Sequence, residues 1–182
     1  MKRLFLPAVF LTIFSGMQSF AAFDYNQSVD EAAIDPLTAY HTLYLGMPRS
    51  DFSANFSVLS DWTFYSRPEA LTEWAERSTV ANDVKVTEGV SVYTETTAAK
   101  ARVLAFENYF KTDKKKVAQA IYSRIIATIY AGVEDFPESQ SGNQMTWVQK
   151  DITIVVSFDG KKADDGQYIV RIRRYNNSVL KA

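Results

Sequence analysis

The sequence predicts an α+β fold, in which one long helix and one or two shorter helices pack on an antiparallel β-sheet within a single domain. Three observations lead to this prediction. Residues 113–131 have apolar side chains at helical spacing, and residues 145–175 alternate between apolar and polar side chains in segments separated by turns. The length of 182 residues is typical of one domain.

The long helix is predicted to begin after Thr112 and Asp113, which are good capping residues, and to run to Ala131, where Gly132 supplies a stop. Its apolar side chains recur every fourth residue, so they form a stripe wide enough to cover a flat surface. The stripe consists of Val117, Ile121, Ile125 and Ile129.

The C-terminal part of the chain indicates an antiparallel meander. Strands are expected at residues 145–150, 152–158 and 167–175, and the last two are joined by a Gly- and Asp-containing turn over residues 159–166. One face of each strand is apolar, and we expect the long helix to pack on these faces.

The N-terminal half predicts a similar order of elements. A helix is expected from Pro48 to about Leu59, because Pro fits the first turn and the apolar residues fall on one face. A strand over 62–65 follows, and then a charged segment from Pro68 that contains Leu71, Trp74 and Ala75 at helical spacing. Both halves can thus be written as a helix followed by about three strands, although no residue-level repeat supports an internal duplication.

Between these segments the sequence favours a hairpin and a strand. Residues 84–86 and 90–93 alternate around Thr87-Glu88-Gly89, and Gly is typical of hairpin turns. Residues 102–110 also alternate, with apolar side chains on both sides, which is typical of a strand covered on both faces.

The first residues indicate a secretory signal peptide over 1–21. Lys2 and Arg3 precede an apolar run, and small residues precede a cleavage site between Ala21 and Ala22. The run is too short to span a bilayer. We therefore expect a mature chain of about 160 residues that is secreted or periplasmic, with an acidic, irregular arm over 22–40 and a single domain over 41–182.

The composition excludes several classes of function. The chain has no Cys, which rules out a lipid anchor at the mature terminus, disulfides, a thiol nucleophile and thiolate metal sites. Loss of Lys2 and Arg3 moves the net charge from −1 to −3, which is too small to argue for a nucleic-acid partner. No later segment predicts a membrane span, and no motif predicts a metal site or a cofactor.

The last predicted strand offers candidate binding residues. Arg171, Arg173 and Tyr175 share the face opposite Tyr168, Val170 and Ile172. Arg and Tyr are frequent in binding surfaces. The need for solubility alone would also favour basic residues on an open sheet face. A binding role and a purely structural role are therefore both kept for these residues.

A small hydrolase is the alternative. His41 is the one His in the chain, and neither a second His nor a Gly-x-Ser-x-Gly elbow accompanies it. Carboxylates could also act as the catalytic groups of a hydrolase. The available clusters are Glu69, Glu73 and Glu76 on a predicted helix and Asp135 with Glu138. Each of these is more simply a solvated face or loop. We expect no catalytic residues.

Residues 43–52, which read LYLGMPRSDF, followed by Phe56, resemble the signature of SmpA/OmlA-type outer-membrane assembly lipoproteins and of β-lactamase-inhibitor-protein-like domains. The resemblance implies an α+β fold and a non-enzymatic, protein-binding function in the cell envelope. The lipoproteins carry a Cys for lipidation and the inhibitor proteins carry disulfides, whereas this chain has neither, so their contact residues do not transfer.

These observations favour an exported, non-enzymatic module that binds another envelope or secreted protein without a cofactor. A factor that interacts with a host or a surface is a further possibility, which an exposed patch of Trp, Tyr and Arg would support.

Overall fold

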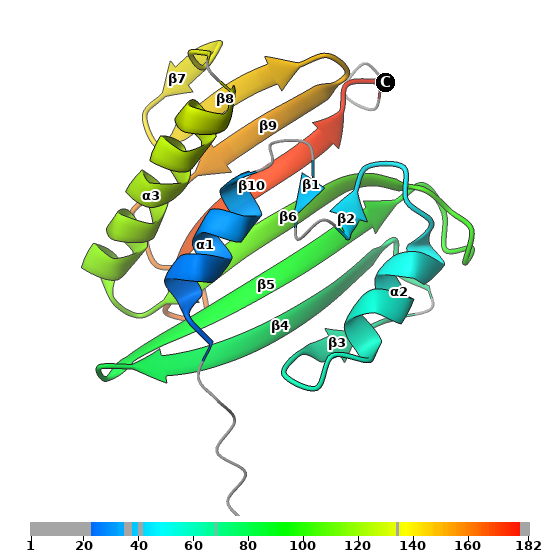
Figure 1. Ribbon diagram of the computed structural model, residues 1–182. Helices are drawn as coiled ribbons and strands as arrows, with labels where there is room; N and C mark the ends of the chain where they lie inside the picture. Colours follow the sequence, from blue (N-terminus) through cyan, green and yellow to red (C-terminus); the bar gives the residue numbers. More distant parts are fainter. Residues whose placement is uncertain (1–22, 35–37, 40–41, 68, 134, 179–182) are drawn as a thin grey trace, which may run out of the picture.

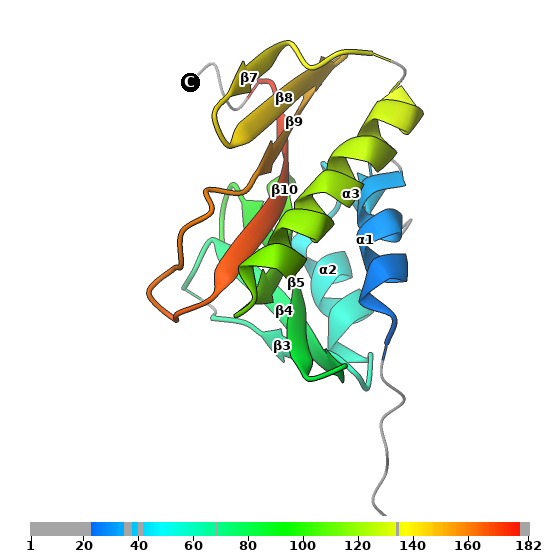
Figure 2. The same ribbon diagram turned by 90° about the vertical axis from the view of Figure 1, so that its left-hand side faces the viewer.

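Among the described residues, three helices lie on one face of an antiparallel β-sheet (Figures 1 and 2). The arrangement is that of a computed structural model, which describes residues 23–34, 38–39, 42–67, 69–133 and 135–178. We call the side with the helices the covered face and the other side the open face. The prediction of an α+β fold is confirmed.

The helices are α1 (Tyr25–Ile34), α2 (Arg49–Ser57) and α3 (Lys115–Val133). A short pair, β1 (Thr38–Ala39) and β2 (Leu43–Tyr44), precedes α2. The main sheet consists of β3 (Thr63–Tyr65), β4 (Thr72–Ala81), β5 (Val84–Thr94), β6 (Val103–Thr112), β7 (Ser139–Ser141), β8 (Gln144–Gln149), β9 (Ile152–Ser157) and β10 (Tyr168–Asn176).

The sheet is built from two meanders that meet at its centre. Its strand order is β3-β4-β5-β6-β10-β9-β8-β7, with every neighbouring pair antiparallel. The first meander, β3 to β6, follows α2, and the second, β7 to β10, follows α3. The predicted C-terminal meander is therefore confirmed, and β7 adds an edge strand that pairs with β8.

Helix α3 follows the sequence prediction closely. Its buried residues Ala118, Ile121, Ile125 and Ile129 face the sheet. The helix continues to Val133, so Gly132 does not end it. A Cβ atom at Gly132 would lie 3.2 Å from the Ile34 carbonyl oxygen, and the glycine thus allows α1 to approach α3 closely.

The prediction of an irregular arm over 22–40 is wrong, because residues 25–34 form helix α1 and belong to the core. Val29, Ala32 and Ala33 are fully buried against α3 and the sheet. On the outer side, Asp30 accepts two hydrogen bonds from Arg124 of α3, at 2.6 and 2.5 Å. A hydrogen bond from the buried Arg174 to the Ala32 carbonyl, 2.6 Å long, ties the helix to β10.

Two further predictions fail in the first meander. The segment around Trp74 is not a helix but strand β4, and the region 84–93 is not a hairpin but the continuous strand β5. Glu73 and Trp74 point to opposite faces, as strand geometry requires. Gly89, expected in a turn, lies in the middle of β5 opposite Tyr109.

Helix α2 begins after a tight turn. Gly46 has φ +86°, a conformation that Gly adopts readily, and its N–H donates to the Val103 carbonyl at 2.8 Å. Met47 is buried beneath the turn, and Phe52 and Phe56 of α2 pack on the covered face.

The covered face has two apolar clusters separated by charged residues. One cluster lies under α1 and α3 and includes Val86 and Phe110, whereas the other lies under α2 and includes Val90 and Phe106. Between them are buried and partly buried polar side chains that we call the ionic seam. The ionic seam consists of Arg77, Glu88, Asn108 and Arg174.

Within the described part of the chain, no helix combines the length and the apolar character that a transmembrane segment needs.

Candidate functional site

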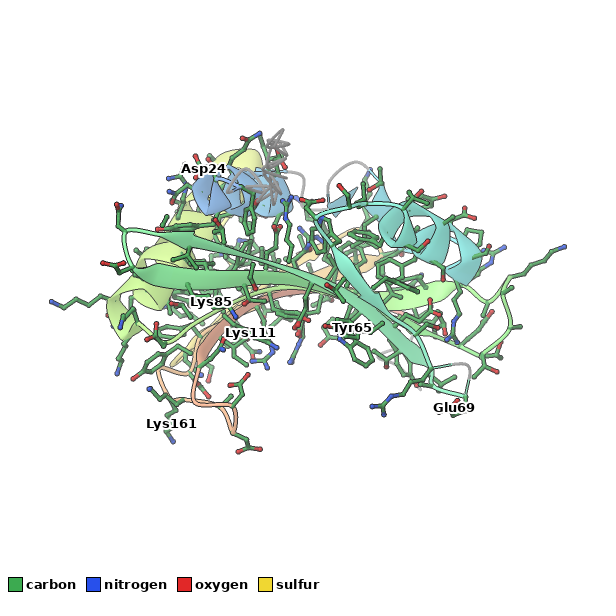
Figure 3. All side chains as sticks on the ribbon, turned by 90° about the horizontal axis from the view of Figure 1, so that it is seen from below. Asp24, Tyr65, Glu69, Lys85, Lys111 and Lys161 are labelled. Atoms are coloured by element: carbon green, nitrogen blue, oxygen red, sulfur yellow. The ribbon has the colours of Figure 1, made fainter. Side chains whose placement is uncertain are left out.

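Polar and aromatic side chains gather on the open face of the main sheet. Figure 3 views the molecule from below, with the helices above the sheet, and the side bearing Tyr65 faces downward. The segment that carries Glu69 and the loop that carries Lys161 extend downward on the two sides (Figure 3). Figure 2 shows that this loop, between β9 and β10, stands away from the helices.

At the centre of the open face, two arginines of β10 share one carboxylate of β6. Arg171 donates from Nε to Glu107 Oε1 at 3.2 Å, and Arg173 donates from Nε to Glu107 Oε2. Partial burial acts to lower the pKa of Arg173, but the hydrogen bond and the charge of Glu107 outweigh it and the net pKa is raised. Both guanidinium groups are partly exposed, so the pair presents positive charge at the surface.

Next to this cluster, Tyr109 lies across Gly89. Its hydroxyl donates a 2.7 Å hydrogen bond to Glu76 Oε1, which also accepts from Lys111 Nζ at 2.9 Å. The Lys111 ammonium lies 4.9 Å from the centre of the Tyr109 ring. Burial, and then the hydrogen bond and charge of Glu76, raise the pKa of Tyr109 far above its usual range, so the phenol stays neutral and donates.

An aromatic pair occupies the β3 edge of the open face. The rings of Tyr65 and Trp74 are stacked, with centroids 5.2 Å apart and an interplanar angle of 14°. The guanidinium of Arg67 lies 5.9 Å from the Trp74 ring. The pair thus offers a flat aromatic area with an adjacent positive charge.

A hollow of about 200 Å³ opens on the same face between β5 and β10. Strand register places Tyr93, Ala105 and Tyr175 side by side on β5, β6 and β10. The small side chain of Ala105 therefore lies between two tyrosines, and this difference in size is the origin of the hollow. Its lining includes Thr72, Ser91, Tyr93, Ala105, Arg173 and Tyr175.

The open face has an excess of positive charge over the strands, in contrast to the acidic chain as a whole. Its basic side chains are Lys85, Lys111, Arg171 and Arg173, and its acidic side chains are Glu76 and Glu107. A second, polar hollow of about 450 Å³ lies farther along the face and is lined by Lys85 and Lys111 together with Asp165 of the β9–β10 loop.

The three residues that the sequence singled out lie together on this face. Arg173 and Tyr175 line the hollow of 200 Å³, and Arg171 adjoins them through Glu107. Sequence reasoning missed Tyr93 and Ala105, because it treated β5 as a hairpin and β6 as covered on both faces. The alternation of acidic, aromatic and basic residues at 107, 109 and 111 was the available signal.

The carboxylates that could have served a hydrolase do not converge. Glu73 lies on the covered face, where it is buried, pairs with Arg49 at 3.0 Å and accepts from Ser53 and Ser66. Glu76 lies on the open face, on the other side of the strand. The prediction that they share a helix is therefore wrong.

Asp135 and Glu138 are both exposed before the edge strand β7. Within the described ranges, no three His, Asp or Glu side chains gather in a way that could hold a metal ion. His41 and the predicted cleavage residues Ala21 and Ala22 lie outside the described residues.

No protein-family model, no curated protein and no solved structure matches this chain.

Proposed function

We propose that this chain is an exported, non-enzymatic module that binds another envelope or secreted protein through its open face. The observation that carries the proposal is the concentration of partly exposed Arg, Tyr and Trp on one uncovered sheet face. Arg, Tyr and Trp are the residue types that contribute most to binding energy in protein interfaces.

The internal contacts of the open face support binding rather than acid–base catalysis. Glu107 is engaged by Arg171 and Arg173, and Glu76 is engaged by Lys111 and Tyr109. A general acid or base needs a proton-transfer atom directed toward a substrate. These carboxylates instead fix the positions of the basic and aromatic side chains, which is what a preorganised interface requires.

Export is the second part of the proposal, and it is based on the sequence. Residues 1–21 combine a basic start, an apolar run and small residues before the expected cleavage site. Because the chain has no Cys, export would add no disulfide, and the fold would depend on packing alone.

A capture experiment with matched variants tests the binding function. Tagged mature protein is incubated with the envelope and medium fractions of the source organism, and bound proteins are quantified by mass spectrometry. Tyr93→Ala and Arg171→Ala/Arg173→Ala alter the open face, whereas Tyr44→Ala removes a tyrosine of similar exposure, 45% against 44% for Tyr93, outside that face.

We expect one stoichiometric partner that the wild type and Tyr44→Ala retain and that the open-face variants lose. Retention of the partner by folded open-face variants would contradict the proposed surface. Absence of any stoichiometric partner would contradict the binding function itself. Cell fractionation, with N-terminal sequencing of the mature chain, tests export and cleavage after Ala21.

A further inference from the structure

We infer that the hollow between Tyr93 and Tyr175 is an anchor pocket for one tyrosine side chain of the partner, presented from an acidic segment. The inference rests on the proposed function and adds the chemistry of the partner. It is based on the geometry, the size and the charge of the hollow.

The geometry of the hollow follows from three side chains in one cross-strand row. Tyr93 and Tyr175 are both register partners of Ala105, on opposite sides of β6. Neighbouring strands are about 4.8 Å apart, so the two tyrosines stand about 10 Å apart at their Cα atoms. Ala105 forms the floor between them, and Ser91 of the adjacent row adds to the lining.

The size of the hollow selects a single side chain. Its volume of about 200 Å³ is below the roughly 300–1,000 Å³ of pockets that enclose a whole small-molecule ligand. Protein interfaces often bury one large anchor residue in such a depression. Walls made of two tyrosines favour an aromatic occupant, because ring pairs pack well in tilted or offset arrangements.

Polar groups at the rim of the hollow favour an aromatic occupant whose ring carries an oxygen atom. Arg173 lines the hollow, donates from Nε to Glu107 and also interacts with Tyr175, and its partly exposed guanidinium carries further N–H groups. The hydroxyls of Thr72 and Ser91 add donors and acceptors. A phenol oxygen can both accept from a guanidinium and donate to a hydroxyl, so tyrosine fits this rim better than phenylalanine.

The charge around the hollow favours a partner in which acidic residues flank the tyrosine. Beside the hollow, Arg171 and Arg173 share the single carboxylate of Glu107, which leaves an excess of one positive charge there. Lys85 and Lys111 extend the basic character farther along the face. An acidic segment would complement this excess and would be steered toward the face at low ionic strength.

Synthetic pentapeptides test the inference directly. The probe has a tyrosine flanked by two glutamates on each side, and the comparison peptides replace the tyrosine with alanine or phenylalanine, or the glutamates with lysines. Binding to the mature protein is followed by backbone amide chemical shifts. We expect perturbations centred on Ser91, Ala105 and Arg173, with about tenfold weaker binding of the alanine and lysine peptides. The phenylalanine peptide should bind less tightly than the tyrosine peptide.

Ala105→Leu is the decisive variant, because a larger side chain on the floor fills the hollow without removing any charge. It should abolish binding of the tyrosine peptide, and Tyr44→Ala should leave that binding unchanged. Tyr175→Ala, which removes a wall, provides a second test if Ala105→Leu fails to fold. Equal binding of the tyrosine and alanine peptides, or full binding by a folded Ala105→Leu variant, would overturn the inference. Capture of a stoichiometric partner that is lost with Arg171→Ala/Arg173→Ala but kept with Ala105→Leu would leave the proposed function intact.

Discussion

The ring of Tyr109 covers Gly89 on the neighbouring strand. A Cβ atom built on Gly89 would lie 2.0 Å from Tyr109 Cζ and 2.4 Å from its hydroxyl oxygen. The absence of a side chain at Gly89 thus allows the phenol to lie flat and to reach Glu76 on the next strand. This one glycine positions the aromatic and charged side chains in the middle of the open face.

Gly89→Ala is expected to destabilise the protein by about 1–3 kcal/mol, because the new methyl group would overlap the Tyr109 ring and force it to move. Urea unfolding of the wild type and the variant measures the loss. In a Tyr109→Ala background the same substitution should cost much less, since the ring is no longer there. Equal costs in the two backgrounds would show that the ring contact is not the cause.

Arg77→Met is expected to lower the free energy of unfolding by on the order of 3 kcal/mol, because it removes the guanidinium that bonds the fully buried Glu88 at 2.7 Å. It also removes the 3.0 Å bond to Ser28 of α1. Replacing both charges, as Arg77→Met/Glu88→Leu, should recover much of the loss. Lys116→Ala on the exposed side of α3 is the control and should leave the unfolding midpoint unchanged.

Removal of α1 is expected to abolish cooperative unfolding. A chain that begins at residue 38 loses the buried Val29, Ala32 and Ala33 and the carbonyl that accepts from Arg174. Circular dichroism during heating compares it with a chain that begins at residue 23. An unchanged midpoint would mean that α1 contributes little, as expected for the irregular arm that the sequence suggested.

Tyr109 makes stability sensitive to alkaline pH. Its pKa is raised in the folded state by burial and by Glu76, so the contribution of its neutral form is fully present below the unfolded pKa of about 10 and is lost as pH rises above that value. We expect Tyr109→Phe to lose stability less steeply than the wild type above about pH 10. Urea midpoints at several pH values measure the two slopes. Tyr122 contributes in the same direction, because burial also raises its pKa, and Tyr122→Phe serves as the comparison.

Residues with regular hydrophobic spacing were predictable, and those with buried charges were not. Helix α3 and the C-terminal strands follow simple apolar periods. Strand β4 does not, because its covered face carries Glu73 and Arg77, which are paired with Arg49 and Glu88. The alternation of apolar and polar residues that marks a strand was therefore hidden in this segment, and its remaining apolar residues had helical spacing.

Two other errors have equally local causes. The apolar stripe of α1 is made of Val29, Ala32 and Ala33, at spacings of three and four, and small alanines among acids are a weak hydrophobic signal. The local sequence favours a turn at Gly89, because the ring that fills its place comes from a strand that the local sequence does not reveal. For the candidate site, alternation alone put Arg171, Arg173 and Tyr175 on one face, but the hollow needs the pairing of three strands.

The meeting of the two meanders at β6 and β10 has a consequence for biogenesis. Among the described residues, β10 is the last strand of the main sheet, so β6 lacks its second neighbour until residues 168–176 have been synthesised. During that time an edge beside Phe106 and Phe110 has unpaired backbone groups, which is a template for aggregation. A product truncated before residue 168 would keep this edge permanently and is expected to accumulate in inclusion bodies, whereas a chain that includes β10 closes the edge by pairing β10 with β6.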